Sequence, residues 1–288
     1  MRLLASSPPS TARLPPPQAC GGHFWIAASW LLAATATLAE PSWKSELTPP
    51  GPGDFAPLAP CVVDLQVSWK GLLDSGTVRM EFAPKEMRKP GSLVVRSAST
   101  SLGTAAVLFP YASHTWSEID LVSLHPKFFQ STETDGKETV VTTNRHFPDR
   151  VESTEVTTPR HQKPLAKRRQ HEFAASPIFD AYSAMLHIRS QKLAPGDRIT
   201  LLIHPFHNPY LLRVKVVARE IHLDRKTIRL SVGMRKIDRK TLELRPYRKM
   251  KRDATLWLSD DAERIPVELR AAIFIGDIRA TLSDFRKS

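Results

Sequence analysis

The chain has almost no cysteine, and this limits how it can be stabilised. Only Cys20 and Cys61 occur among its 288 residues. Cys20 lies in a leader that we expect to be removed, so an intramolecular disulfide is excluded and packing must stabilise the fold. Cys61 is then predicted to be a small buried or half-buried hydrophobic residue. A lipoprotein signal at Cys61 is unfavourable, because Pro60 precedes it and no apolar segment leads into it.

The sequence also lacks the short motifs of common enzymes and metal-binding proteins. It has no nucleophile elbow, phosphate loop, dinucleotide fingerprint or zinc quartet. His204 and His207 have an H-x-x-H spacing, but Pro205 and the pair Asn208-Pro209 indicate a turn without a third ligand. We therefore expect no metal site and no cofactor.

No catalytic constellation stands out either. Ser183 shares a helix face with Asp180 and His187, a spacing that helix geometry alone produces often. The acidic residues of 260–263 lack the glycine-spaced pattern of a calcium loop and are explained by a hairpin turn. We assign no catalytic residue and expect a protein that is not an enzyme.

One uninterrupted apolar run occurs, at residues 24–39 (FWIAASWLLAATATLA). It is shorter than the roughly 20 residues that a bilayer-spanning helix needs, and it ends in small residues suited to cleavage. We predict a signal peptide at 1–39 and a mature protein that begins near Glu40, in the periplasm or cell envelope. Arg2 and Arg13 lie far from the run, so a start codon assigned too early, or an uncleaved N-terminal anchor, stays open as an alternative.

The chain is strongly basic. Residues 1–39 hold two arginines and no acidic residue, so their removal lowers the formal net charge from +12 to +10. An exported protein of this charge meets anionic lipid head groups, polysaccharide or cell wall rather than nucleic acid. An ordinary solvated basic surface explains the charge equally well. We expect a monomer that is peripheral to a membrane at most.

Beyond the leader, the pattern changes twice. Residues 40–61 are rich in proline and predict a tether, because proline removes backbone donors and restricts rotation. From residue 62 onward apolar and polar residues alternate with period two, which is typical of antiparallel sheet with one wet face. A single β domain is therefore expected at 62–288. The clearest predicted strands are 62–69 and 78–82, which form a hairpin with its turn at 71–76, and 227–234, 241–245 and 265–275.

One segment has helical rather than strand periodicity. Ser176 can cap a helix that begins at Pro177, and apolar residues recur at helical spacing up to residue 191. This predicts an amphipathic helix over 177–191 against the concave face of a curved sheet. Tyr182, Met185 and Leu186 on its apolar stripe are the candidate residues to face an apolar ligand. A plain core helix is the alternative.

A second candidate surface is basic. The run from Arg160 to His171 contains no acidic residue, and we read it as a loop. Lys167, Arg168 and Arg169 are its candidate contacts to an anionic surface.

Several motifs together resemble a known bacterial exported family, domain of unknown function 3108. They are residues 67–71 (VSWKG), 118–120 (EID), 146–149 (HFPD), 176–181 (SPIFDA), 185–189 (MLHIR), 255–261 (TLWLSDD), 264–266 (RIP) and 274–278 (FIGDI). The resemblance covers most of 62–285 and implies an envelope protein rich in antiparallel strands. It supplies no activity or catalytic residue. The proline-rich leader and the basic stretch after Pro159 depart from the family pattern.

The sequence therefore predicts an all-β, mainly antiparallel protein with a curved meander sheet or half-open barrel and one helix. Its predicted function is that of a non-enzymatic cell-envelope protein that holds a lipid or another apolar molecule. The rival is a structural or adaptor protein that docks on anionic envelope surfaces through basic loops.

Overall fold

A computed structural model describes residues 40–49, 51–55, 58–172, 177–273 and 276–287. All of these residues belong to one compact unit, Glu40–Ser288. The predicted signal peptide at 1–39 lies outside the described residues and stays a prediction.

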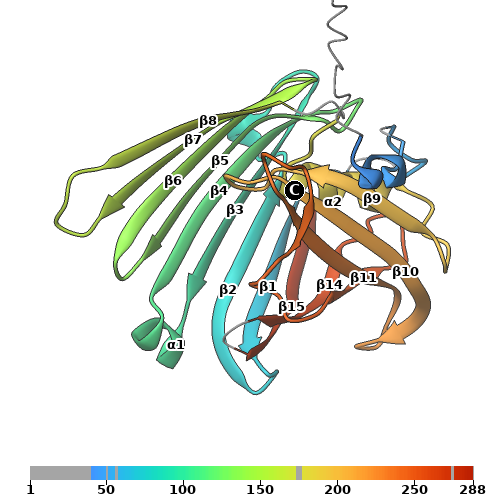
Figure 1. Cartoon of the computed structure of the whole chain (residues 1–288). Coiled ribbons are helices and arrows are strands. Elements are labelled where there is room, and N and C mark those ends of the chain that lie inside the picture. Colours follow the sequence, from blue (N-terminus) through green and yellow to red (C-terminus); the bar gives the residue numbers. More distant parts are fainter. Residues whose placement is uncertain (1–39, 50, 56–57, 173–176, 274–275, 288) are drawn as a thin grey trace, which may run out of the picture. The chain divides into compact units, whose positions relative to one another are not determined.

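Fifteen strands form one antiparallel sheet (Figure 1). The first eight are β1 (Cys61–Trp69), β2 (Leu73–Phe82), β3 (Ser92–Ser101), β4 (Tyr111–Asp120), β5 (Pro126–Asp135), β6 (Glu138–His146), β7 (Arg150–Pro159) and β8 (Leu165–Glu172). The other seven are β9 (Arg198–Ile203), β10 (Tyr210–His222), β11 (Arg225–Ile237), β12 (Leu244–Pro246), β13 (Ala254–Ser259), β14 (Pro266–Ile273) and β15 (Gly276–Lys287).

The sheet consists of two meanders that meet at the first and last strands. Its order is β8-β7-β6-β5-β4-β3-β2-β1-β15-β14-β13-β11-β10-β9, and β12 pairs with β11. At the junction Val63 pairs with Phe285, and Val67 with Ala280. Strands β8 and β9 are the two ends of this order, so the sheet is curved but not closed into a barrel (Figure 1). The predicted antiparallel, curved fold class is confirmed.

The alternation that predicted strands also decides which residues are buried. In β1 the side chains of Val63 and Leu65 are buried, whereas Asp64 and Gln66 keep partial exposure. The predicted hairpin is confirmed, with Val63 opposite Met80. Its turn is shorter than the predicted 71–76, because positive φ at Lys70 and Gly71 lets the chain reverse before Leu73.

The predicted helix begins later than the sequence indicates. Helix α2 spans Ala181–Ser190, and its N-cap is Asp180, whose carboxylate accepts from the Ser183 backbone N–H at 2.7 Å. The delay has a physical cause: Phe179 is still extended and pairs with the outer edge of β9 through hydrogen bonds to Leu202 and His204. The expected cap, Ser176, lies outside the described residues. The other helical segments are α1 (Gly103–Leu108), η1 (Ser42–Glu46) and η2 (Lys85–Met87).

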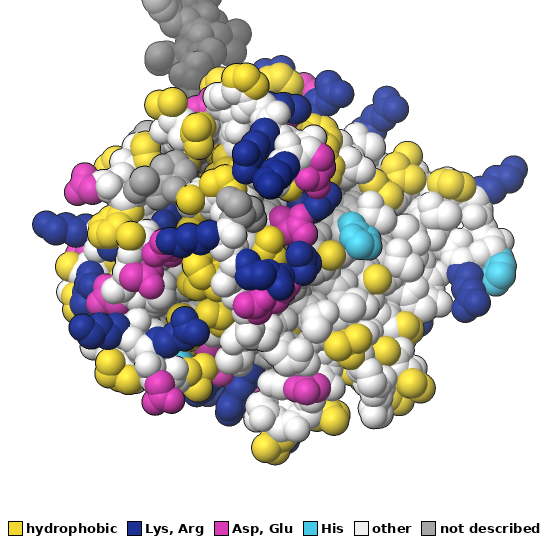
Figure 2. All heavy atoms as spheres, turned by 180° about the vertical axis from the view of Figure 1, so that it is seen from behind, with side chains coloured by type: hydrophobic (Ala, Val, Ile, Leu, Met, Phe, Trp, Pro, Cys, Tyr) yellow, Lys and Arg dark blue, Asp and Glu magenta, His cyan; other side chains and the backbone are white. Residues whose placement is uncertain are grey.

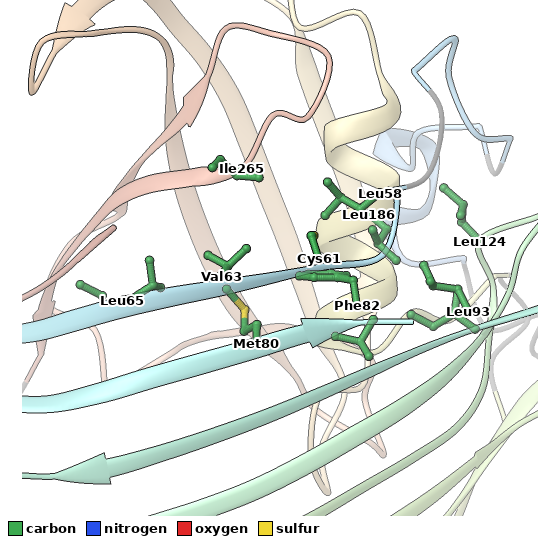
Figure 3. Packing of buried hydrophobic residues seen from close by; sticks show 13 residues of the cluster. Leu58, Cys61, Val63, Leu65, Met80, Phe82, Leu93, Leu124, Leu186 and Ile265 are labelled. Carbon is green, nitrogen blue, oxygen red and sulfur yellow. The ribbon is translucent and has the colours of Figure 1, made fainter. Parts of the chain in front are cut away.

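The main hydrophobic cluster lies between α2 and the middle of the sheet (Figure 3). Cys61, Val63, Met80 and Phe82 contribute from β1 and β2, and Leu186 from α2. Cys61 is buried, as predicted, and burial raises the pKa of its thiol to about 11. The thiol is therefore protonated and unreactive at neutral pH.

The segment predicted to be a tether packs against the sheet instead. Trp43 is buried and its indole N–H donates to the Leu242 carbonyl at 2.8 Å. The Gly53 backbone N–H donates to Ser190 Oγ at 2.9 Å, next to the end of α2. Proline disfavours helix and interior strand but leaves tertiary contacts open, and for this reason composition alone led to the wrong expectation. These residues are part of the β unit.

Candidate functional site

The inner face of the sheet has two chemically different walls. Toward one end the paired residues are apolar, in the row Val67, Ala280, Leu269, Leu256, Leu230 and Val216 across β1, β15, β14, β13, β11 and β10. Toward the other end a second row, which starts opposite Val63 of β1 at Met80 of β2, becomes polar through Ser97, Thr115, Ser131, Thr142, Glu155 and Lys167 across β3 to β8. An apolar molecule would gain free energy only on the first wall.

Helix α2 lies on this inner face and holds the three predicted ligand-facing residues. The Tyr182 hydroxyl hydrogen-bonds Ser97 Oγ at 2.6 Å and also Thr115 Oγ1. Leu186 is fully buried in the main cluster, and Met185 packs against the same cluster. The helix therefore brings the three side chains together on the sheet. Their contact with a ligand stays a prediction.

An apolar pocket lies beside α1, away from these residues. It has a volume of about 270 Å³. Its walls come from the ends of β1 and β3, from the starts of β2, β4 and β15, and from α1. The lining residues are Val67, Trp69, Leu73, Ser75, Ser101, Thr104, Ala105, Leu108, Phe109, Tyr111 and Ile278. Aromatic and large aliphatic side chains stand next to small ones here and leave a space that the protein's own atoms do not fill.

The polar groups in this lining are largely engaged with the protein itself. Ser75 Oγ donates to the Val67 carbonyl at 3.3 Å, and Ser101 Oγ accepts from the Tyr111 backbone N–H at 2.9 Å. A ligand in the pocket therefore meets mainly carbon. The Trp69 indole is held in place by Gly276, whose φ of 127° and missing side chain let the ring approach its backbone closely.

Sequence reasoning missed this pocket. The run from Ala105 to Phe109 is apolar but too short for a helical or strand period to show, and it follows β3 as an ordinary connection would. The pocket is marked in the structure by exposed apolar side chains, and not in the sequence by a periodic pattern. Val107, Leu108 and Phe109 are 81%, 63% and 61% exposed, which is unusual for three consecutive large apolar residues.

The predicted basic loop is a strand. Lys167, Arg168 and Arg169 belong to β8, at the edge of the sheet. Lys167 lies 3.6 Å from Glu155 of β7, and Arg169 pairs with Ser153 on the same inner face, so Arg168 points to the other face. The three cations therefore do not share one surface. Lys and Arg side chains are spread over the far side of the unit, among Asp and Glu (Figure 2).

Four buried or half-buried histidines meet where β6, β7 and β8 approach the connection between β9 and β10; we call His146, His171, His204 and His207 the histidine seam. The rings of His171 and His204 lie 4.9 Å apart. Ser153 Oγ hydrogen-bonds His207 Nδ1 at 2.7 Å, and the Asn144 amide donates to the Phe206 carbonyl at 2.7 Å. Burial lowers the pKa of His171 to about 4 and also lowers that of His204. Uncharged imidazoles thus join the two ends of the sheet.

The seam does not amount to a metal centre. Across the part of the chain that the structure describes, no group of three or more His, Cys, Asp or Glu side chains has an arrangement that could hold a metal ion. Ser183 is also explained without chemistry, because its hydroxyl completes the capping box of α2 by accepting from the Asp180 backbone N–H at 2.9 Å. Among the described helices, none is long and apolar enough to cross a membrane.

The chain belongs to the family described as "Protein of unknown function (DUF3108)", whose model matches residues 64–283. This confirms the resemblance found in the sequence. A comparison with curated proteins finds no match.

The solved structures that are similar to the chain include the following three. One is a β-barrel-like protein of the family of unknown function DUF1849 from Brucella abortus, with a TM-score of 0.49 and 11% identity, covering 81% of this chain and 99% of its own. The second is a protein from Bacteroides fragilis that is provisionally described as exported and has a YmcC-like fold. Its TM-score is 0.30 and its identity 9%, and the match covers 82% of this chain and 100% of the other. The third, provisionally a lipoprotein from Parabacteroides distasonis, has a TM-score of 0.30 and 6% identity over 82% and 99%.

Proposed function

We propose that this member of the family is a non-enzymatic protein of the bacterial cell envelope that holds a lipid acyl chain in the pocket beside α1. One observation carries the proposal: the pocket of about 270 Å³ is lined mainly by apolar side chains, and its serine hydroxyls are already engaged. Each methylene group that enters such a space contributes about 0.8 kcal/mol. A polar ligand would lose its hydrogen bonds to water there without replacement.

The surroundings of the pocket fit an acyl chain that is delivered from a lipid phase. Leu108 and Phe109 line the pocket and also remain largely exposed. Val107, which precedes them in α1, and Leu72, which precedes the lining residue Leu73, are 81% and 89% exposed. The apolar surface of the pocket thus continues onto the outside of the protein. A lipid can keep apolar contact from the surface into the pocket.

The rival function is docking on an anionic envelope surface through Lys167, Arg168 and Arg169. Neighbouring residues of a strand point to opposite faces, so only one face of β8 can meet a flat surface at a time. Lys167 is also paired with Glu155. Both features favour the acyl-chain carrier over a docking role for this run.

Filling the pocket tests the proposal. Ala105→Phe introduces a ring among the lining residues, whereas Val107→Phe adds the same ring at an exposed position of the same helix. Fluorescence titration with parinaric acid, a fluorescent C18 fatty acid, should show binding by the parent and by Val107→Phe. Ala105→Phe should bind at least about tenfold more weakly, which corresponds to about 1.4 kcal/mol.

Two results would count against the carrier. One is equal binding of parinaric acid by Ala105→Phe and the parent, with both proteins folded by circular dichroism. The other is that protein purified from its own envelope carries no lipid in native mass spectrometry and that the parent does not bind the probe.

A further inference from the structure

A second hollow, separate from the apolar pocket, is lined mainly by cations; we call it the cationic groove. It has a volume of about 540 Å³ and lies where the end of β8 meets the end of β11 and the turn after it. The lining residues are Arg169, Gln170, His171, Lys236, Asp238, Arg239, Lys240 and Leu242. Four of these eight carry a full positive charge, and they come from two distant parts of the sequence.

The positive charge of the groove is not balanced by acidic side chains in the described parts of the chain. Within these residues, no ion pair is found for Arg169, Lys236, Arg239 or Lys240. Elsewhere in the same unit, surface arginines and lysines commonly pair, as Arg245 does with Asp238 at 3.0 Å. An unpaired cluster of like charges lowers stability by mutual repulsion, and a bound anion relieves that repulsion.

The single acidic residue of the groove is already engaged. Asp238 pairs with Arg245 and also accepts the backbone N–H groups of Lys240 and Thr241 at 3.0 and 3.1 Å. These hydrogen bonds hold the pKa of its carboxyl below the usual value. Asp238 therefore fixes the turn, and its one negative charge, which also acts on Arg239, leaves most of the positive charge of the groove unbalanced.

Arg169 of β8 and Arg239 of the turn after β11 both line the groove. Burial lowers the pKa of Arg239, and the positive charge of nearby Arg169 lowers it further. Arg169 is half-buried on the inner face of the edge strand, whereas Arg239 is exposed on the turn. Two planar guanidinium forks that line one groove can each bind two oxygens of one tetrahedral anion.

We infer that the cationic groove binds a phosphoryl group, either as a free phosphate ester or as the head group of an anionic lipid. A carboxylate offers one negative charge and two oxygens, which leaves most of the cluster unneutralised. A phosphoryl group offers up to two charges and three oxygens, which match the two arginines and the neighbouring lysines. Phosphoryl binding in the groove does not depend on acyl-chain binding in the pocket beside α1.

Strand alternation supplies a matched control. Arg169→Gln with Arg239→Gln removes two charges that line the groove. Arg168→Gln with Arg235→Gln removes two charges from β8 and β11, but neither residue lines it. The net charge of the two double variants is equal, so unspecific attraction to anions falls by the same amount in both.

Binding is measured with glycerol 3-phosphate by calorimetry, and with phosphatidylcholine vesicles containing phosphatidic acid by co-sedimentation. The groove variant should bind at least about tenfold more weakly than the parent, and the control variant within about twofold of it. Binding of both probes indicates a site for the phosphoryl group itself, whereas vesicle binding alone identifies a lipid head group. Equal affinities of the two double variants would overturn the inference, and so would failure of the parent to bind either probe. Unchanged binding of parinaric acid in the groove variant would show that the two sites are independent.

Discussion

At the scale of single residues, the histidine seam gives the clearest expectation for how stability depends on pH. The charged groups that face it are Arg169 and Lys167 of β8, Arg239 of the turn after β11, Glu155 of β7 and Asp180 before α2. Burial is the main cause that lowers the pKa of each seam histidine, and the nearby arginines lower those of His171 and His207 further. A proton taken up here adds positive charge to a region that is already cationic.

We expect stability to fall as the pH falls. A histidine whose folded pKa is lowered contributes fully above its unfolded pKa of about 6.5, and the contribution is lost as the pH drops toward the folded value. For His171 that window runs from about 6.5 down to about 4. The free energy of unfolding is measured with urea at pH 7 and at pH 5. Between these two pH values it should fall by about 1–2 kcal/mol less in His171→Gln than in the parent. His114 is exposed, so His114→Gln should show the same decrease as the parent. An equal decrease in all three proteins would contradict the role given to His171.

For the seam, the sequence predicted the local turn but not the contacts between distant histidines. The proline next to His204 predicted a turn, and the turn is present. The meeting of that turn with His146 and His171 requires the sheet to curve back on itself, and no spacing along the chain encodes this. The buried Cys61 was predictable for the opposite reason, because its neighbours in the strand pattern already indicate the inner face.

Among the elements, β8 is a strand that the sequence predicted to be a loop. Strands with one buried face alternate apolar and polar residues, but Leu165 to Arg168 are all exposed. An edge strand with solvent on both faces leaves no alternation to read, so its charge density suggested a loop. The end of α2 was predictable from its stripe, whereas its start was not, since the pairing of Phe179 with β9 keeps the chain extended.

The charges on β8 have a structural role that can be tested. This strand is the last one at one end of the sheet order, and lysine or arginine on an edge strand discourages pairing with a second chain. Lys167→Val with Arg168→Val should therefore form larger species at protein concentrations where the parent does not. Size-exclusion chromatography with light scattering measures this. Lys215→Val with Arg235→Val, on strands that have partners on both sides, should elute like the parent.

For the molecule as a whole, the pairing of β1 with β15 decides whether there is one sheet or two. Antiparallel meanders follow from local alternation and turns, and the sequence predicted the first hairpin of one half and three strands of the other. The contact between the first and last strands has no local signal, because any strand with an apolar face could occupy that position. The curved shape was predicted, and its central junction was not.

Deleting residues 276–288 should abolish cooperative unfolding of the whole unit, and its effect should not be limited to the loss of one strand. β15 lies between β1 and β14, so its loss separates the two meanders and exposes Val63 and Leu65. The apolar area lost is large against a total stability of about 5–15 kcal/mol. Near-ultraviolet circular dichroism should show loss of tertiary structure, whereas deletion of 286–288 alone should leave the signal intact. A cooperative urea transition in the longer deletion would show that one meander folds by itself.

The same junction has a kinetic consequence. Folding rates fall as the sequence separation of contacting residues grows, because a long loop must close before its contacts form. Here the central contact joins the two ends of the folded unit, with Cys61 opposite Lys287. While the polypeptide is still being synthesised, β1 has no partner on one side, and it stays an open edge until the last strand has been added. The middle of the sheet, which looks like its most protected part, is thus the part that a growing chain completes last.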